Sequence, residues 1–250
     1  MIKVIFEISI LYLLQQKYCY IFRSLSRFSL ILFLEVDVIY FLSDPHFGHV
    51  KILQYEPKRQ TILGQNIQEH DSNLLKRINS RVRENDILVV VGDFSLGGYS
   101  DIKKYRSEIQ CKNLWLVLGN HDKASISQYY ASGFSVVCHE IVLKIAGEFV
   151  RVAHYPYKKP WHQIIFPWQK KEKDRKKRPR NYGGWLLHGH IHSGMHRNEA
   201  WKVFGRKINV GVDVWEYYPV AITEVESIIS REKNRKIGWF KRFCEKCLYL

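Results

Sequence analysis

The sequence predicts an α/β fold in which strands and helices form packed layers. Short runs of β-branched and aromatic residues alternate with longer segments whose apolar residues recur at helical spacing. The strand-like runs end in Asp, His or Asn, and in α/β folds such residues gather beyond the carboxyl ends of strands. The chain of 250 residues is 46% hydrophobic, which is enough to bury a core of this kind.

The first half of the chain contains three predicted strands separated by two predicted helices. The strand-like runs are residues 36–42, 86–91 and 113–118, each short, apolar and followed by polar residues. Residues 61–83 and 100–111 are helical in pattern, because their apolar side chains can share one face of a helix. This alternation argues for an α/β layered fold.

The second half continues with strand-like runs and closes with a helix-like run. A C-terminal helix is expected to begin within residues 222–229. The expected strands are residues 136–142, 149–153, 185–187, 208–212 and 219–223.

Residues 185–192 run from an apolar segment into three histidines at alternate positions. Side chains two residues apart on an extended chain point the same way, so His188, His190 and His192 can approach one point. Neutral imidazole is the commonest protein metal ligand near neutral pH, and this spacing therefore suits a metal site. Taken alone, the run fits a His-rich surface strand equally well.

Five predicted strands end in residues of the metal-ligand type. A carboxylate and an imidazole two residues apart, as in Asp44 and His46, can chelate one ion, whereas the alternative is an Asx turn with an incidental histidine. Structural turns would explain one or two of the five strand ends, but not all of them. The residues are Asp44 and His46, Asp93, Asn120 and His121, His154, and His190 and His192.

These residues form motifs that resemble the five signature blocks of the calcineurin-like metallophosphoesterases. The blocks are complete and in order, and the resemblance covers residues 36–228 without the two termini. It implies an α/β fold, namely a β-sandwich of two mixed sheets flanked by helices (αββα), with two metal ions at its edge. The stretches 47–49 and 209–213 are similar to those of small bacterial and phage-type members. The motifs are Asp44-x-His46, Gly92-Asp93, Gly119-Asn120-His121-Asp122, His154 and Gly189-His190-x-His192.

The resemblance also implies a binuclear metal centre in which Asp93 bridges two divalent ions. Oxygen and imidazole donors without thiolate suit Mn²⁺, which we expect, as well as Fe, Zn²⁺ or Ni²⁺. A hydroxide shared between two such ions would be the nucleophile, and the ions would clamp the attacking and leaving oxygens. Pro45 departs from the family pattern and stiffens the loop between two ligands. One ion is assigned to Asp44, His46, Asp93 and His192, and the other to Asp93, Asn120, His154 and His190.

Other residues in or near these motifs receive roles outside the ligand set. The resemblance implies that His121 gives a hydrogen bond or proton to the leaving oxygen and that Asp122 orients its ring. Asp122 could also cap a helix over residues 123–131. His49 is assigned a phosphate contact, with a solvent-facing position as the alternative, and His188 a structural role behind the ligands. The remaining histidines, His70, His139, His162 and His196, receive no role.

The net charge of +15 is concentrated in two segments. Residues 158–180 carry ten Lys or Arg and two acidic residues, and residues 229–250 carry seven and two. We therefore expect a nearly neutral metallophosphoesterase domain over residues 36–228, with a basic insert at 158–180 and a basic tail at 229–250. The insert mixes cations with aromatic residues, a combination that single-stranded nucleic acid binding uses. The alternative is that the insert is a solvated loop. The tail could instead lie on an anionic membrane surface.

Residues 1–35 form an apolar extension that charged residues interrupt. Because Glu7, Lys17, Arg23 and Arg27 break the apolar runs, we expect neither a membrane-spanning helix nor a signal peptide. The extension is expected to be poorly ordered or peripheral, or to be translated sequence upstream of the natural start. Five cysteines without regular spacing argue against a disulfide framework and fit a cytoplasmic location.

Two functional classes fit the sequence. The resemblance implies a metal-dependent phosphoric ester hydrolase that acts on a phosphodiester or a phosphomonoester. The alternative is a binding protein on the same scaffold that holds nucleic acid or an assembly partner with little turnover. The full set of ligand-type residues together with His121 favours the enzyme. The physiological substrate and the oligomeric state are left open.

Overall fold

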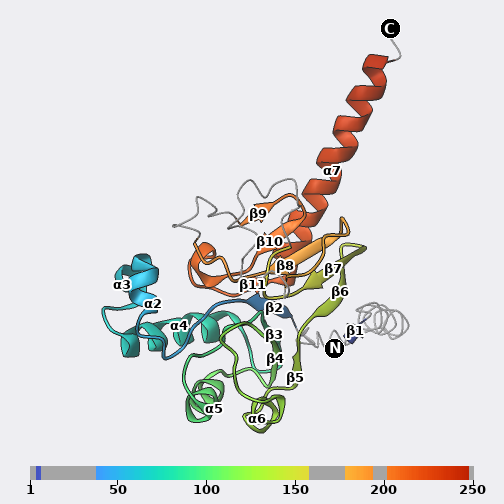
Figure 1. The fold of residues 1–250 in the computed structure, drawn as a ribbon. Helices are drawn as coiled ribbons and strands as arrows, with labels where there is room; N and C mark the ends of the chain where they lie inside the picture. Colours follow the sequence, from blue (N-terminus) through green and yellow to red (C-terminus); the bar gives the residue numbers. More distant parts are fainter. Residues whose placement is uncertain (1–3, 7–37, 158–177, 194–201, 248–250) are drawn as a thin grey trace, which may run out of the picture.

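A computed structural model describes residues 4–6, 38–157, 178–193 and 202–247 (Figure 1). Its strands form a six-stranded sheet in the order β1-β6-β7-β8-β10-β9 and a five-stranded sheet in the order β11-β2-β3-β4-β5. Both sheets contain parallel and antiparallel pairs. The expected α/β fold with a sandwich of two mixed sheets is therefore confirmed.

The five-stranded sheet is mainly parallel. Strands β2, β3, β4 and β5 pair in parallel, and β11 closes one edge in the antiparallel sense. Val89 packs toward the other sheet, whereas its neighbours Leu88 and Val90 pack toward the helices. Burial on both faces explains why these strands read as continuous apolar runs. The bounds are β2 (Ile39–Leu42), β3 (Ile87–Val90), β4 (Asn113–Val117), β5 (Val136–Cys138) and β11 (Val220–Ala221).

The six-stranded sheet is built around the β6–β7 hairpin. Its turn is Ala146-Gly147, and both residues have positive φ, 50° and 75°, as a tight two-residue hairpin requires. From the N-terminal extension, Val4–Phe6 pair in parallel with β6. The bounds are β1 (Val4–Phe6), β6 (Ile141–Ile145), β7 (Glu148–Val152), β8 (Trp185–His188), β9 (Val203–Phe204) and β10 (Lys207–Asn209).

The single strand expected at residues 136–142 was a wrong prediction. The chain leaves the five-stranded sheet after Cys138 and enters the six-stranded sheet at Ile141. Both pieces are rich in valine and isoleucine, so their composition does not reveal that the pairing partner changes from β4 to β7. The crossing between sheets lies in the two residues His139 and Glu140.

The helix expected at residues 61–83 is also divided. Gly64 has φ 143° and ends α3, and the Asn66 side chain accepts the Glu69 N–H at 2.9 Å to begin α4. This is the N-cap geometry that Asn favours. The helices are α2 (Ile52–Tyr55), α3 (Pro57–Leu63), α4 (Ile67–Arg81), α5 (Tyr99–Glu108), α6 (Ile126–Ala131) and α7 (Ile222–Cys247).

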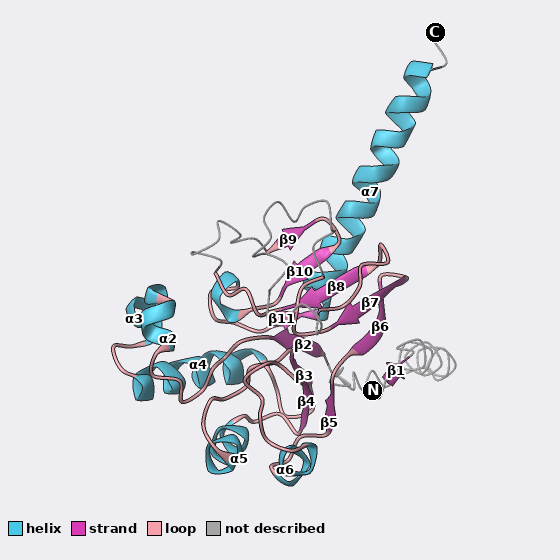
Figure 2. Cartoon of the chain, viewed as in Figure 1, coloured by secondary structure: helices cyan, strands magenta, loops and turns pink. Residues whose placement is uncertain are grey.

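Two apolar cores hold these layers together. One fills the space between the sheets, and the other joins the five-stranded sheet to α4, α5 and α6 on its outer face (Figure 2). Helix α7 adds Val225 and Ile229 to the first core and then runs outward, away from both sheets, to the C-terminus (Figure 1). Among the helices of the described residues, none combines the length and apolar character that a membrane crossing needs. Residues 158–177 of the basic insert lie outside the described residues.

Candidate metal centre

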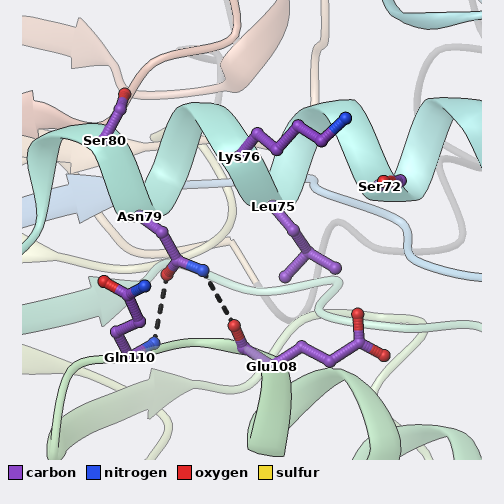
Figure 3. A pocket seen from close by; sticks show the side chains of 7 residues that line it. All are labelled: Ser72, Leu75, Lys76, Asn79, Ser80, Glu108 and Gln110. Atoms are coloured by element: carbon purple, nitrogen blue, oxygen red, sulfur yellow. Dashed lines mark hydrogen bonds between the residues drawn. The ribbon is translucent and has the colours of Figure 1, made fainter.

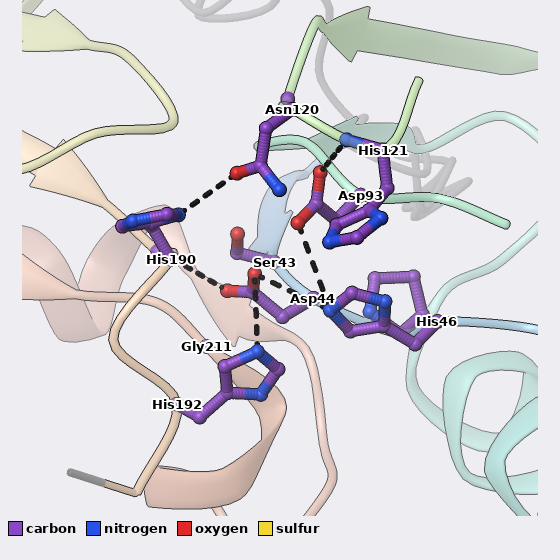
Figure 4. Close-up of polar contacts among 12 residues, drawn as sticks. Ser43, Asp44, His46, Asp93, Asn120, His121, His190, His192 and Gly211 are labelled. Atoms are coloured by element: carbon purple, nitrogen blue, oxygen red, sulfur yellow. Dashed lines mark hydrogen bonds and ion pairs between the residues drawn. The ribbon is translucent and has the colours of Figure 1, made fainter. Parts of the chain in front are cut away.

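The residues predicted to bind metal follow the carboxyl ends of five strands. Neighbouring parallel strands β2, β3 and β4 end at one edge of their sheet, and the parallel pair β7 and β8 ends beside them in the other sheet. The loops that follow therefore converge, and Figure 4 shows the labelled side chains of these loops gathered at one place. These loops carry Asp44, His46, Asp93, Asn120, His154, His190 and His192.

Six of these side chains form two groups whose potential ligand atoms lie within 4.8 Å of one another. We call Asp44, His46 and His192 the first triad, and Asp93, His154 and His190 the second triad. The two triads are adjacent, since His46 Nε2 lies 3.7 Å from Asp93 Oδ2.

The seventh predicted ligand, Asn120, lies within the second triad. Its Oδ1 is 3.1 Å from His154 Nε2 and 2.9 Å from His190 Nδ1. Asp93 reaches both triads, because its Oδ2 is also 3.4 Å from His154 Nε2. The structure brings together the residues of each expected ligand set, while metal binding by these residues and the bridging role of Asp93 stay predictions.

Five of the predicted ligands have a left-handed backbone. Among the described residues, eight other than glycine have positive φ, and Asp44, His46, Asp93, His190 and His192 are five of them, with φ between 49° and 70°. Such conformations are unfavourable for side-chain-bearing residues and persist where the surrounding structure over-determines them, often at functional sites. The loops are therefore bent to aim these side chains inward.

The glycine before three of the ligands makes room for a ligand from another strand. A Cβ atom at Gly189 would overlap the side chains of Ser43 and Asp44, and one at Gly119 would overlap the Asp93 carboxylate. Close approach of backbone and side chain at the strand ends is therefore built into the motifs. The same holds at Gly92, where a Cβ atom would overlap the ring of His154.

The donor set of the first triad fits a divalent cation. Asp44 Oδ1 and His46 Nε2 are buried, have no hydrogen-bond partner among the described residues and lie 3.9 Å apart. Buried polar atoms are nearly always satisfied, and a cation bound beside these two atoms would give both of them a partner. Imidazole and carboxylate donors suit Mn²⁺, Fe or Zn²⁺.

Burial and neighbouring charges adjust the protonation of the site. Burial lowers the pKa of His190 to about 2 and the pKa of His46 well below its usual value. Burial also lowers the pKa of His154, but the charge of Asp93 and a hydrogen bond to it raise that pKa to about 9. His46 and His190 are thus neutral near pH 7, and each has a nitrogen lone pair for a metal ion.

His121 lies outside both triads. Its backbone N–H donates to Asp93 Oδ1 at 2.8 Å, and its ring centroid is 5.3 Å from that of His46 (Figure 4). The ring is partly exposed beside the triads, a position from which it can meet a substrate. Its role as proton donor stays a prediction.

Asp122 contacts backbone groups of two loops, and its predicted orientation of the His121 ring stays a prediction. Its carboxylate accepts the backbone N–H groups of Gly119 at 2.7 Å, Asp93 at 2.8 Å and Phe94 at 3.0 Å. In the part of the chain that the structure describes, no hydrogen bond joins it to the His121 ring. Helix α6 begins at Ile126 with Ser125 as its N-cap, so Asp122 does not cap it. Asp122 instead ties together the loops that follow β3 and β4.

Three other positions near the site are now placed. Pro45 leaves Asp44 and His46 within one triad, so it does not displace either residue. The His49 ring lies 5.4 Å from that of His46 and 6.1 Å from that of Tyr55, outside both triads, and its phosphate contact stays a prediction. His188 is fully buried outside both triads, as expected for a structural role.

Sequence reasoning did not single out two buried charged residues beside the first triad. Arg59 and Asp213 form an ion pair with Arg59 Nε 2.6 Å from Asp213 Oδ1, and Asp213 Oδ2 is 3.1 Å from His192 Nδ1. Asp213 follows a predicted strand, so the rule used for the other strand ends would have found it. Nothing in the sequence distinguishes Arg59 from a surface arginine on a helix.

A surface pocket between α4 and the end of α5 lies on other elements than the triads (Figure 3). Asn79 spans it, donating to the Glu108 carbonyl at 2.8 Å and accepting the Gln110 N–H at 3.1 Å. The lining includes no histidine or cysteine, and Glu108 is its one acidic residue. The metal-ligand chemistry of the described residues therefore lies at the strand ends and not in this pocket.

Comparisons with known proteins identify a family and relatives of this chain. A family model described as calcineurin-like phosphoesterase matches residues 38–221. The uncharacterized protein MJ1445 of Methanocaldococcus jannaschii is 28% identical over 199 residues, which cover 78% of this chain and 93% of that protein. The gene 66 protein of Mycobacterium phage L5 is 26% identical over 194 residues, which cover 70% and 86%.

The fold has a counterpart among solved structures. The protein of unknown function AQ665 from Aquifex aeolicus is similar with a TM-score of 0.53 and 22% identity, over 77% of this chain and 99% of that one. The family model spans both triads and most of the described fold. The chain therefore belongs to the calcineurin-like phosphoesterase family.

Proposed function

We propose that the protein is a phosphoric ester hydrolase that uses two divalent metal ions, one at each triad. The observation that carries this proposal is the pair of adjacent triads with Asp93 between them. The unpartnered Asp44 Oδ1 and His46 Nε2 add support, because a bound cation would give both buried atoms a partner.

Each group of the site has a separate task in this proposal. Asp44, His46 and His192 would hold one ion, His154, His190 and Asn120 would hold the other, and Asp93 would contribute to both. When bound, the two ions neutralise the phosphoryl oxygens and activate water for attack. His121 donates a proton to the leaving oxygen from its partly exposed position. Asp122 holds the loop of Asp93 in place through its backbone hydrogen bonds.

Hydrolysis assays with and without metal test this proposal. Protein stripped with a chelator is assayed on a p-nitrophenyl phosphodiester and on the matching monoester, each with Mn²⁺, Fe²⁺, Zn²⁺ or Ni²⁺ added back. We expect no turnover without metal and the best recovery with Mn²⁺. Full activity after exhaustive chelation would exclude a mechanism with metal ions.

A second observation favours nucleic acid as the substrate or held ligand. Three aromatic residues near the outer face of the six-stranded sheet are largely exposed, Phe149 by 64%, Tyr182 by 75% and Phe204 by 61%. The Arg151 guanidinium lies 5.8 Å from the Tyr182 ring centroid, and Lys207 Nζ lies 4.8 Å from that of Phe204. Exposed rings beside cations are what single-stranded nucleic acid uses for stacking and charge neutralisation.

The sheet register places several of these groups in one row. Arg151 pairs with Leu186 in β8, Leu186 pairs with Lys207 in β10, and Lys207 pairs with Phe204 in β9. The neighbours Val152, Leu187 and Ile208 face the core between the sheets, so the row lies on the opposite face, where Leu186 is covered by Ala153 and Tyr157. The basic insert connects β7 to β8 and therefore leaves from the same sheet.

Oligonucleotide binding by chelated protein tests this second candidate. We expect binding of a single-stranded oligonucleotide that weakens steeply with salt. Tyr182→Ala and Phe204→Ala should each weaken it, because base stacking is worth about 1–3 kcal/mol per base. Tyr130→Ala, which alters a 49% exposed tyrosine on α6, serves as the matched control. Equal binding by all three variants would contradict the nucleic acid surface.

A further inference from the structure

Arg59 is a fully buried cation that binds the loop of the first triad. Its Nη2 donates to the Asp44 carbonyl at 2.8 Å, and its Nη1 donates to the Pro45 carbonyl at 3.1 Å. Its Nε and Nη2 also form a two-pronged contact with Asp213, at 2.6 and 2.7 Å. Such a planar fork fixes the positions of all its acceptors at once.

Asp213 also contacts His192, a predicted metal ligand. Its Oδ2 lies 3.1 Å from His192 Nδ1, while His192 Nε2 lies 4.0 Å from Asp44 Oδ1 on the other side of the ring. A carboxylate on one ring nitrogen holds the proton there and leaves the other nitrogen free to bind a metal ion. His192 is therefore aimed into the first triad (Figure 4).

Electrostatics keep this arrangement ionised. Burial alone would raise the pKa of Asp213, but the charge of Arg59 and its hydrogen bonds hold that pKa below its usual value. Because the two opposite charges neutralise each other, Asp213 can accept from His192 without adding an uncompensated buried charge.

In the second triad, the contacts of the two histidine Nδ1 atoms are with neutral groups. His154 Nδ1 lies 2.9 Å from the neutral carbonyl of Val91, and His190 Nδ1 contacts the Asn120 amide. Among the described residues, neither Arg59 nor Asp213 is hydrogen bonded to Asp93, His154 or His190.

Glu56 lies close enough to His192 and Asp213 to form a third group of ligand type. Asp213 already uses both oxygens for Arg59, and Glu56 Oε2 accepts the Ser193 hydroxyl at 2.5 Å. A cation placed among them would meet the guanidinium of Arg59. This group therefore supports the first triad and does not form a third metal site.

We infer that the Arg59–Asp213 pair is a positioning unit for the ion of the first triad. It fixes the loop at Asp44, aims His192 Nε2 and sets the affinity of that ion separately from the ion of the second triad. The inference rests on the proposed binuclear centre and names residues outside the predicted ligand set.

Calorimetric titration of metal-free protein with Mn²⁺ tests this inference. Wild-type protein should bind two equivalents. Asp213→Asn and Arg59→Lys should each weaken one equivalent by about 10–100-fold, as loss of outer-shell partners does elsewhere, and leave the other nearly unchanged. Arg106→Lys is the matched control, because Arg106 donates to three backbone carbonyls, of Gly133, Ile109 and Lys112, away from the triads.

A second measurement separates positioning from general stability. Nitrogen NMR of the metal-free wild type should show His192 protonated at Nδ1, and Asp213→Asn should shift that signal toward the other tautomer. If Arg59→Lys does not fold, the nearly isosteric Asp213→Asn carries the test alone. Equal weakening of both equivalents, weakening by the control, or an unchanged His192 signal would overturn the inference.

Failure of the proposed function gives a different result. Suppose that the wild type binds two equivalents but hydrolyses no ester, and that Asp213→Asn weakens only one of the equivalents. This result contradicts the hydrolase and supports the positioning unit. Normal hydrolysis together with equal weakening of both equivalents in Asp213→Asn overturns the positioning unit alone.

Discussion

The two triads differ in how their side chains are held. In the second triad, His154 Nε2 lies close to both Asp93 and the neighbouring Asn120, and the Val91 carbonyl anchors His154 through Nδ1. In the first triad, Asp44 Oδ1 and His46 Nε2 have no partner among the described residues. Its stability comes from outside, through the pair of Arg59 and Asp213.

The comparison shows that buried polar atoms of the first triad have no hydrogen-bond partner among the described residues, whereas those of the second triad have partners without a metal ion. A buried polar atom without a partner costs about 1–3 kcal/mol. A metal ion would remove that cost in the first triad, whereas in the second it must replace contacts that already exist. The first triad should therefore gain more stability from metal binding, and four experiments test the two triads and their surroundings.

Asp93→Ala should have the largest effect, because Asp93 reaches both triads. We expect loss of the second ion, weaker binding of the first and a fall in hydrolysis on the order of 10³-fold. Metal analysis after gel filtration, with the assay on a phosphodiester, measures both. If Asp93→Ala loses no more metal than His121→Ala, Asp93 does not hold both ions.

His121→Ala should keep both ions and lose turnover. A positioned proton donor contributes about 10²–10⁴-fold to rate, and more for a poor leaving group than for p-nitrophenolate. The comparison of an alkyl ester with a p-nitrophenyl ester in the same variant measures this. An equal loss for both esters would contradict the role of His121 as proton donor.

Two glycine substitutions should separate the triads. In Gly189→Ala the new methyl group would overlap Asp44, and in Gly119→Ala it would overlap Asp93. Overpacking of this kind costs about 1–3 kcal/mol, so both variants should unfold at lower temperature. In Mn²⁺ titrations Gly189→Ala should weaken the first ion more, and Gly119→Ala the second.

Gly98→Ala is the control for this pair, since a Cβ atom there has no heavy atom within 4 Å. It should leave metal binding unchanged. The assignment of each glycine to its triad is wrong if Gly189→Ala and Gly119→Ala weaken the same equivalent.

Neutralising the basic insert should affect neither triad. The insert has a net charge of +8 in residues 158–180, and its cations would attract a polyanion without touching the reacting phosphorus. We expect a higher KM for an oligonucleotide at low salt and nearly unchanged turnover of a small ester. Arg178 is left unchanged because it is buried. The variant replaces Lys170, Lys171, Lys173, Arg175, Lys176 and Lys177 with Ser.

The small ester serves as the internal control in that experiment. Oligonucleotide kinetics equal to those of the wild type would remove the insert from the proposed nucleic acid interface. The exposed aromatic residues near the six-stranded sheet would then be tested by their own variants.

Local sequence was sufficient for the elements whose partners are implied by their own pattern. The runs that became β2, β3, β4 and β8 are apolar enough to be buried on both faces, and each ends at a polar loop. The boundary between α3 and α4 was also readable, because Asn66 followed by Glu69 is an N-cap pattern. The prediction of a single helix over residues 61–83 did not take this N-cap pattern into account.

The sequence by itself determined which side chains stand at the strand ends, because strand length and residue type are local properties. Only the tertiary structure decided what supports them. Arg59 and Asp213 are 154 positions apart, and neither belongs to a periodic pattern. The switch between sheets after Cys138 depends on which strands lie beside the chain. Contacts of this range are set by the packing of whole layers, so no local window of residues encodes them.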